Sequence, residues 1–143
     1  MTGSRKKIGI TMGDPAGVGP EIVVKSLQEK RIHELCLPVV VGDPECMRRA
    51  VEEIVKTPMK IHVISKASEA RGEFGVMDVL PISPAPPRDL PFGKVDARCG
   101  DAAFRAVETA IRLAMSGELD GTVTAPLNKE SMNLAGHHFD GHT

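Results

Sequence analysis

The stretch ITMGDPAGVGPE, residues 10–21, decides how the start of this chain folds. It follows a short apolar run and leads into an amphipathic run, which predicts a strand, a glycine-rich turn and a helix. Gly13, Gly17 and Gly19 allow the backbone to take positive φ and to approach a ligand closely. Gly19 is a candidate N-cap, with Pro20 at the first helical position.

A turn of this kind presents N–H groups at a helix N-terminus, which suits an anion such as a phosphate. A tight strand-to-helix connection that binds nothing explains the same spacing equally well. The string matches neither the dinucleotide fingerprint nor the P-loop. The spacing alone therefore leaves both interpretations open.

Composition restricts the class of protein. A chain of 143 residues with 41% hydrophobic residues suits one domain with a real core. A net charge of −1 and 3% aromatic residues argue against a protein that binds nucleic acid or an anionic membrane. Three widely spaced cysteines indicate thiols in a reducing compartment. No apolar segment is long enough for a signal peptide or a membrane span, so a cytoplasmic location is expected.

Strand-like and helix-like patterns alternate along the chain, which predicts an α/β fold with a largely parallel sheet. The expected elements are a first helix to about Lys30, strands at 37–42, 61–64, 76–82 and 120–126, a helix from Pro44 that Pro58 stops, a long helix from Cys99 to just before Gly117, and a short helix from Asn128 to Ala135. A proline-rich loop is expected over 81–91. His62 is expected to face outward from its strand.

Two helices have predicted inner faces, because apolar residues recur in them at helical spacing. In the helix that Pro58 stops, this face comprises Met47, Ala50, Val51, Ile54 and Val55. In the longest helix, the predicted buried stripe comprises Phe104, Val107, Ile111, Ala114 and Met115.

Ligands collect at the carboxyl ends of the strands in parallel α/β sheets. Two predicted strand ends carry polar groups, namely the opening loop with Asp14 and the segment 124–129. Within that segment, Lys129 either neutralises a substrate anion or is a solvated first-turn residue, and solvation is the default interpretation.

Three histidines, His137, His138 and His142, lie close together and invite a metal interpretation. Two glycines interrupt any helix there and only Asp140 adds a carboxylate, so loop histidines are the favoured interpretation. One histidine at a strand end can still hydrogen-bond a substrate or a phosphate. The residues alone lead to an α/β protein with a glycine-rich anion loop.

Four motifs in order, ITMGDPAGVGPEI, CGDAAFRAVETAI, DGTVTAPLNKESMNLAG and GHT, resemble the N-terminal part of the 4-hydroxythreonine-4-phosphate dehydrogenase family. The glycine loop is also similar to that of isocitrate and isopropylmalate dehydrogenases, whose fold this family shares. The resemblance implies that residues 1–143 are the N-terminal α/β portion of a longer two-domain subunit. This portion is isopropylmalate dehydrogenase-like, with a mostly parallel sheet flanked by helices, and is truncated before the second half.

The resemblance further implies an NAD(P)- and divalent-metal-dependent dehydrogenase that forms a homodimer. In this family 4-(phosphooxy)-L-threonine is oxidised to a β-keto acid, which loses CO2 to give 3-amino-2-oxopropyl phosphate for pyridoxal 5′-phosphate synthesis. The metal (Zn, Mg or Co) polarises the alcohol oxygen. The alternatives are a dehydrogenase of an erythronate- or threonate-type sugar-acid phosphate, a non-catalytic anion-binding or dimerisation module, and a phosphate acyltransferase.

The family's substrate-binding His-Thr pair matches His142 and Thr143. The family's metal-binding histidines, and its Lys, Asn and Arg that hold the substrate, lie further downstream than this chain extends. No catalytic residue, metal ligand or cofactor contact is therefore assigned, and His137 and His138 are not promoted to metal ligands. The 143 residues alone are expected to lack dehydrogenase activity.

Overall fold

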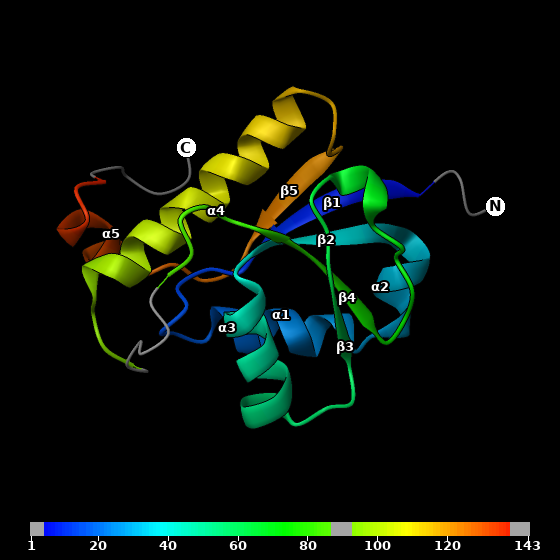
Figure 1. The fold of residues 1–143 in the computed structure, drawn as a ribbon, viewed down its shortest axis with the longest axis horizontal. Coiled ribbons are helices and arrows are strands. Elements are labelled where there is room, and N and C mark those ends of the chain that lie inside the picture. The colour runs from blue at the N-terminus through cyan, green and yellow to red at the C-terminus, as the bar shows by residue number, and fades with distance from the viewer. Residues whose placement is uncertain (1–4, 87–92, 138–143) are drawn as a thin grey trace.

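The computed structural model describes residues 5–86 and 93–137, which form a five-stranded sheet with helices on both faces (Figure 1). In chain order the elements are β1 (Lys6–Thr11), α1 (Gly19–Leu27), α2 (Lys30–Leu35), β2 (Cys36–Gly42), α3 (Pro44–Arg49), η2 (Ala50–Val55), β3 (Lys60–Val63), η3 (Ala67–Glu69), β4 (Val76–Pro81), α4 (Ala97–Met115), β5 (Gly121–Thr124) and α5 (Lys129–Leu134). Of these, η2 is a π-helix and η3 is a short 3-10 helix.

Every strand pair within the described residues is parallel, and the strand order is β3-β4-β2-β1-β5. Ile10 of β1 lies between Val40 of β2 and Val123 of β5. The central strand β2 has three fully buried valines in succession, Val39, Val40 and Val41. Such a run is typical of a parallel sheet covered on both faces. The predicted α/β class, with a mostly parallel sheet flanked by helices, is confirmed.

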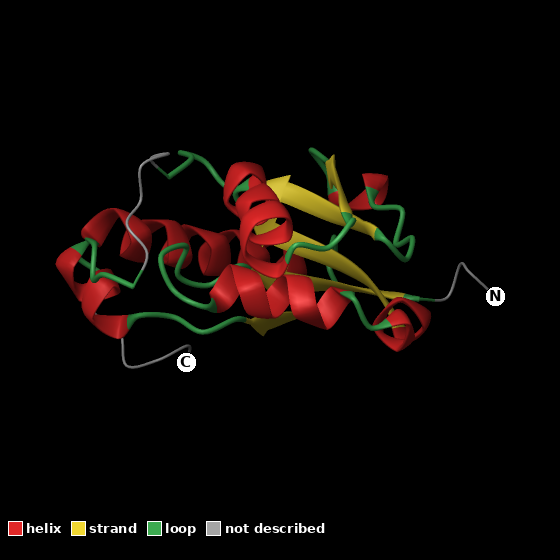
Figure 2. Cartoon of the chain, turned by 90° about the horizontal axis from the view of Figure 1, so that it is seen from below, coloured by secondary structure: helices red, strands yellow, loops and turns green. Residues whose placement is uncertain are grey.

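The helices divide between the two faces according to the direction of the connections. The chain runs from β1 to β2 and on to β3, and later returns from β4 across the sheet to β5. Because parallel crossovers are right-handed, these two directions place their helices on opposite faces. α1 and α3 cover one face, while α4 crosses β1, β2 and β5 on the other, with α5 packed along it (Figure 2).

The first helix is shorter than predicted. α1 begins at Gly19, with Val18 in the N-cap position and no side-chain cap, so Gly19 is not the N-cap. It ends at Leu27 and does not reach Lys30, because Glu29 takes an extended conformation with ψ of 111° and α2 begins after it.

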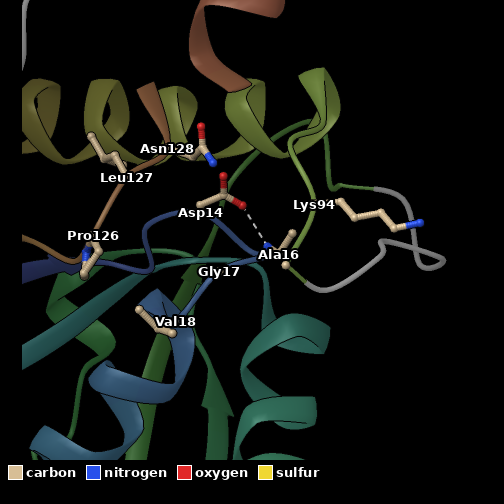
Figure 3. Close-up of a pocket in the computed structure, with 9 residues that line it drawn as sticks. Asp14, Ala16, Gly17, Val18, Lys94, Pro126, Leu127 and Asn128 are labelled. Atoms are coloured by element: carbon tan, nitrogen blue, oxygen red, sulfur yellow. Dashed lines mark hydrogen bonds between the residues drawn. The ribbon is translucent and has the colours of Figure 1, made fainter. Parts of the chain in front are cut away.

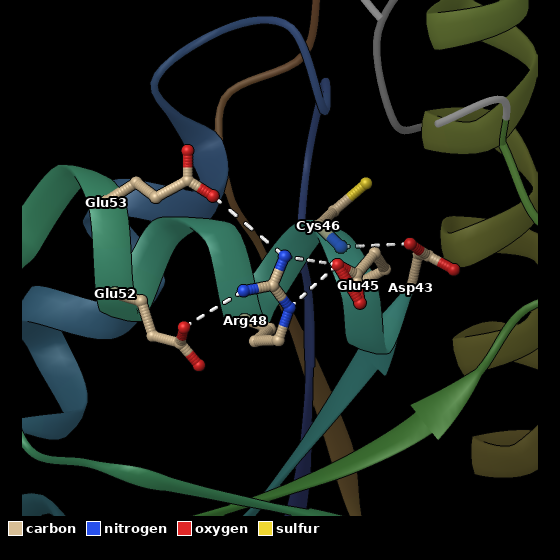
Figure 4. Close-up of polar contacts among 6 residues, drawn as sticks. All are labelled: Asp43, Glu45, Cys46, Arg48, Glu52 and Glu53. Atoms are coloured by element: carbon tan, nitrogen blue, oxygen red, sulfur yellow. Dashed lines mark hydrogen bonds and ion pairs between the residues drawn. The ribbon is translucent and has the colours of Figure 1, made fainter. Parts of the chain in front are cut away.

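The next helix begins as predicted, since the Asp43 side chain accepts a hydrogen bond from the Cys46 N–H at 2.9 Å. Arg48, on the solvent side, is surrounded by three carboxylates (Figure 4), those of Glu45, Glu52 and Glu53. These are exposed pairs, which contribute little to stability. The stability of this helix therefore depends on the packing of its opposite face.

The inner face of that helix is confirmed in its first half only. Met47, Ala50 and Val51 are buried, but Ile54 is 36% exposed. The change coincides with η2, because the wider turn of a π-helix rotates the side chains out of α-helical phase. The helix ends where Lys56 takes a left-handed conformation, before Pro58 is reached.

The longest helix is correctly located, but its predicted buried stripe is wrong. α4 begins at Ala97 rather than Cys99, with Asp96 as the N-cap, and Gly117 lies just past its end as expected. Met115 is 84% exposed and Ile111 is 43% exposed. The buried face consists of small residues instead, namely Cys99, Gly100, Ala102, Ala103, Ala106 and Ala110. Small side chains allow α4 to lie close to the sheet and to α5. The face of α4 that is buried is therefore the one that permits this close approach, not the one with the largest apolar side chains.

His62 does not simply face outward. It lies opposite Asp78 in the register of β3 and β4, and its Nδ1 is 2.7 Å from Asp78 Oδ1. The other oxygen of Asp78 accepts the N–H groups of Arg71 and Gly72. This buried carboxylate therefore ties the turn before β4 to the edge of the sheet.

Two further observations concern the class of protein. None of the helices within residues 5–86 and 93–137 has the length and apolar character needed to cross a membrane. The three cysteines are free thiols, and Cys99 is fully buried.

Candidate functional site at the ends of β1 and β5

The two strand ends that carry polar groups lie side by side, because β1 and β5 are neighbours in the sheet. The N–H of Asp14, just beyond β1, donates to the carbonyl of Pro126, just beyond β5, at 3.1 Å. Gly13 makes this approach possible, since its φ is 75° and a Cβ there would lie 2.4 Å from the same carbonyl oxygen.

This position in the sheet is a topological switch point. The chain passes from β1 into α1 on one face and from β5 into α5 on the other face. In open α/β sheets, ligands bind in the crevice that forms where adjacent connections diverge in this way.

The three loop glycines have different roles. Gly13 has a positive φ, whereas Gly17 and Gly19 do not, so the expectation of positive φ at those two residues is wrong. Gly19 is needed for close packing instead, because a Cβ there would lie 2.2 Å from the carbonyl oxygen of Met12.

The loop's own groups already bond two of the N–H groups that an anion would use. Asp14 Oδ1 accepts the N–H of Ala16 at 2.8 Å, and the Asp14 carbonyl accepts the N–H of Gly17 at 3.0 Å. At these positions the geometry favours a tight connection over an open phosphate cradle.

The Asp14 side chain is buried in surroundings that oppose its negative charge. Burial raises the pKa of this carboxyl, the Ala16 N–H lowers it, the charge of Asp96 raises it and a hydrogen bond with the Ser131 side chain lowers it. The net result is a pKa above the ordinary value of 3.8. Hydrogen bonds from the Arg98 side chain and backbone hold the pKa of Asp96 at about 2. Another anion placed here would be repelled.

A cavity of about 290 Å³ opens beside Asp14 (Figure 3). Three segments form its walls, and the residues that they contribute are Asp14, Ala16, Gly17, Val18, Gly93, Lys94, Pro126, Leu127 and Asn128. The N–H of Gly93 donates to the Ala16 carbonyl at 2.7 Å, which joins the segment before α4 to the glycine loop. Figure 3 shows the Lys94 side chain directed away from Asp14. Mostly apolar walls with a few polar groups suit part of an organic ligand.

The residues predicted to contact substrate, His142 and Thr143, lie outside the described residues, as does His138. Lys129 lies exposed in the first turn of α5. Asn128 caps α5 as predicted, because its Oδ1 accepts the N–H of Ser131 at 2.9 Å.

His137 is held against α4. Its ring stacks on Phe104 with centroids 3.8 Å apart, and its Nε2 is 3.0 Å from Asp101 Oδ1. The described residues contain no group of three or more His, Cys, Asp or Glu side chains placed to bind a metal ion. Within them, no ligand can be named for the metal that the resemblance implies.

Three residues at or beside the site were not predicted from the sequence, namely Asp96, Ser131 and Lys94. A weak signal existed for two of them, since Asp96 precedes a helix and Ser131 is the third residue after the capping Asn128. Nothing in the sequence places them beside Asp14, because the contact depends on how α4 and α5 pack.

Comparisons of the chain with known proteins all point to the same family. A family model described as "Pyridoxal phosphate biosynthetic protein PdxA" matches residues 34–143. The chain is 44% identical to a D-threonate 4-phosphate dehydrogenase of Cupriavidus necator, covering 95% of this chain and 40% of the relative. It is 39% identical to a 4-hydroxythreonine-4-phosphate dehydrogenase of Trichlorobacter lovleyi, covering 100% of this chain and 43% of the relative.

A solved structure agrees with the fold. The crystal structure of a 4-hydroxythreonine-4-phosphate dehydrogenase from Burkholderia phymatum superposes with a TM-score of 0.91 at 48% identity, over 96% of this chain and 41% of that one. The chain thus spans about 40% of the length of the relatives that it matches.

Proposed function

The chain belongs to the family of pyridoxal phosphate biosynthetic protein PdxA, and on that premise we propose that it is the N-terminal α/β part of a dehydrogenase. The proposed reaction oxidises the secondary alcohol of a phosphorylated four-carbon hydroxy acid. The observation that carries the proposal is the cavity at the switch point between β1 and β5, in a chain whose relatives are named dehydrogenases. The proposal includes a homodimer, and a divalent metal whose ligands lie outside the described residues.

Two substrates are candidates, and each has its own support. D-threonate 4-phosphate is favoured by the relatives at 44% and 42% identity that carry its name. 4-(Phosphooxy)-L-threonine is favoured by the family description and by the relative at 39% identity. The two acids share a carboxylate, a 3-hydroxyl and a 4-phosphate, and they differ in having a hydroxyl or an amine at carbon 2.

The chemistry of both candidates is the same. The 3-hydroxyl loses its proton, carbon 3 loses a hydride, and the product is a β-keto acid. Loss of CO2 from that acid leaves a ketone phosphate with an amine or a hydroxyl beside the carbonyl. NAD or NADP, when bound, supplies the hydride acceptor.

The charges of the site suggest which ligand the cavity takes. The substrate carries a carboxylate and a phosphate, and the buried carboxyl of Asp14 would repel both. The cavity is therefore proposed to hold a part of the nicotinamide cofactor other than its anionic pyrophosphate. The substrate is proposed to contact His142 and Thr143.

The test is a spectrophotometric assay of the full-length protein with NAD+ or NADP+ and each acid phosphate in turn. We expect reduced cofactor with at least one acid, and no turnover from residues 1–143 alone. Absence of cofactor reduction with both acids and both cofactors would contradict the proposal.

The substrate contact has its own test. His142→Ala in the full-length protein should raise KM for the acid phosphate and leave the melting temperature almost unchanged. If the variant unfolds instead, the role of His142 is structural.

A further inference from the structure

The end of α5 fixes the direction in which the chain leaves that helix. Gly136 follows the helix with a φ of 92°, and its N–H donates to the carbonyl of Asn133 at 3.0 Å. The N–H of the next residue, His137, donates to the carbonyl of Met132 at 2.9 Å. These two bonds form a Schellman motif, which ends a helix and sets the course of the residue after the glycine. The backbone therefore directs His137 to a defined place.

The His137 side chain adds two contacts with α4. Its ring lies nearly parallel to that of Phe104, with an interplanar angle of 8° and centroids 3.8 Å apart. Its Nε2 lies 3.0 Å from Asp101 Oδ1, while the other oxygen of Asp101 accepts a hydrogen bond from Arg105 Nε at 2.8 Å. Because an ionised carboxylate only accepts hydrogen bonds, Nε2 is the donor in this contact. Asp101, Phe104 and His137 are called the α4 clamp below.

The clamp connects a short helix to a long one. α5 has only six residues, too few to be stable alone in water, whereas α4 has 19 residues and packs on β1, β2 and β5. The two helices lie in direct contact, because a Cβ at Gly100 would lie 2.1 Å from the carbonyl oxygen of Ser131. The position of His137 therefore depends on α4.

The clamp immediately precedes the segment that carries the proposed substrate contacts. His142 and Thr143 follow His137 by five and six residues. Five residues of extended chain span at most about 18 Å, so the place of His137 limits where His142 can lie. Anchoring one end of a binding segment also lowers the entropy that is lost when a ligand orders it.

We propose that the α4 clamp positions the substrate-contacting pair: it anchors the start of the segment 138–143 on α4 and thereby raises the affinity for the acid phosphate. Asp101, Phe104 and His137 are positioning residues in this proposal and take no part in the chemistry. The role of His142 and Thr143 rests on the proposed function, whereas the clamp rests on contacts among the described residues.

The first test uses the cofactor-reduction assay with variants of the full-length protein. Asp101→Ala and Phe104→Leu should each raise KM for the acid phosphate by about threefold to tenfold, the range expected for one lost hydrogen bond or ring contact. The values of kcat and of KM for NAD+ should stay within about twofold, since the clamp acts on substrate binding. Phe104→Tyr keeps the stacked ring and should match the wild type. Glu108→Ala, which removes an exposed carboxylate from the same helix, is the matched control for Asp101→Ala.

Two outcomes of this assay would overturn the inference. Unchanged KM in Asp101→Ala and Phe104→Leu, in a protein whose KM rises with His142→Ala, would mean that the clamp only supports the fold. An equal rise in Phe104→Tyr and Phe104→Leu would mean that the stacked ring is not what positions the segment. If Phe104→Leu does not fold, Asp101→Ala alone decides.

Hydrogen exchange tests the clamp without any ligand. In Asp101→Ala and Phe104→Leu, the amides of residues 137–143 should exchange faster than in the wild type, whereas those of β1 should not change. Glu108→Ala should leave both regions unchanged. Unchanged exchange over residues 137–143 in the clamp variants would overturn the inference. Failure of the wild-type protein to turn over either acid would instead count against the proposed function, and exchange would still decide whether the clamp anchors the segment.

Discussion

Gly13 is the residue on which the geometry of the site depends most directly. Its φ of 75° and the 2.4 Å that would separate a Cβ from the Pro126 oxygen both exclude a side chain. We expect Gly13→Ala to lower the free energy of unfolding by about 1–3 kcal/mol, since a non-glycine residue would be strained there. Urea unfolding measures the change.

Gly17→Ala is the matched control for that substitution. Its nearest neighbouring atom would be 3.6 Å away, an ordinary contact, and its φ is not positive. The control should stay within about 0.5 kcal/mol of the wild type. Equal losses in the two variants would show that the strand-end contact does not constrain Gly13.

Residue-level prediction from the sequence succeeded where the signal was local. The Asp43 and Asn128 caps, and Gly117 just past the end of α4, follow from the residues next to them. The partners of Asp14 and His62 could not be predicted, because Pro126 and Asp78 are brought to them by packing between elements.

At the scale of elements, α4 is the helix whose packing differs most from expectation. The sequence pattern favours its large apolar residues as the buried face, whereas the structure buries its alanines. Ala106→Leu should therefore cost about 1–3 kcal/mol of unfolding free energy through overpacking. Met115→Ala, at an 84% exposed position, should change it by less than about 0.5 kcal/mol. Thermal or urea unfolding of both variants measures which face of α4 is buried. A larger loss of stability with Met115→Ala than with Ala106→Leu would contradict the observed packing and support the stripe predicted from the sequence.

The contact of His137 with α4 gives a prediction about pH. Burial raises the pKa of Asp101, but hydrogen bonds from His137 and Arg105 outweigh it and hold this pKa below its ordinary value of 3.8. A lowered carboxyl pKa stabilises the fold above the unfolded-state value, and this stability is lost as pH falls. The advantage of the wild type over Asp101→Asn should therefore be constant near neutral pH and shrink below about pH 4. Melting temperatures measured from pH 7 to pH 3 test this, and a difference that grows towards acid pH would contradict it.

At the scale of the whole molecule, the fold class could be predicted from the sequence, but the site could be predicted only in part. Alternating strand and helix patterns require a parallel α/β sheet, and both polar strand ends were identified. The order β3-β4-β2-β1-β5, which brings those ends together, depends on long-range packing that no local pattern encodes. The third wall of the cavity, from Gly93 and Lys94, depends on the same packing.

The central proposal is that the cofactor binds at the switch point between β1 and β5. Hydrogen–deuterium exchange of the full-length protein, with and without NAD+, tests it most directly. Slower exchange is expected at the amides of residues 16–18 and 127–128 when NAD+ is bound, with no change in α2, residues 30–35, at the amino-terminal end of the sheet. Protection confined to other parts of the protein, with these amides unchanged, would contradict it.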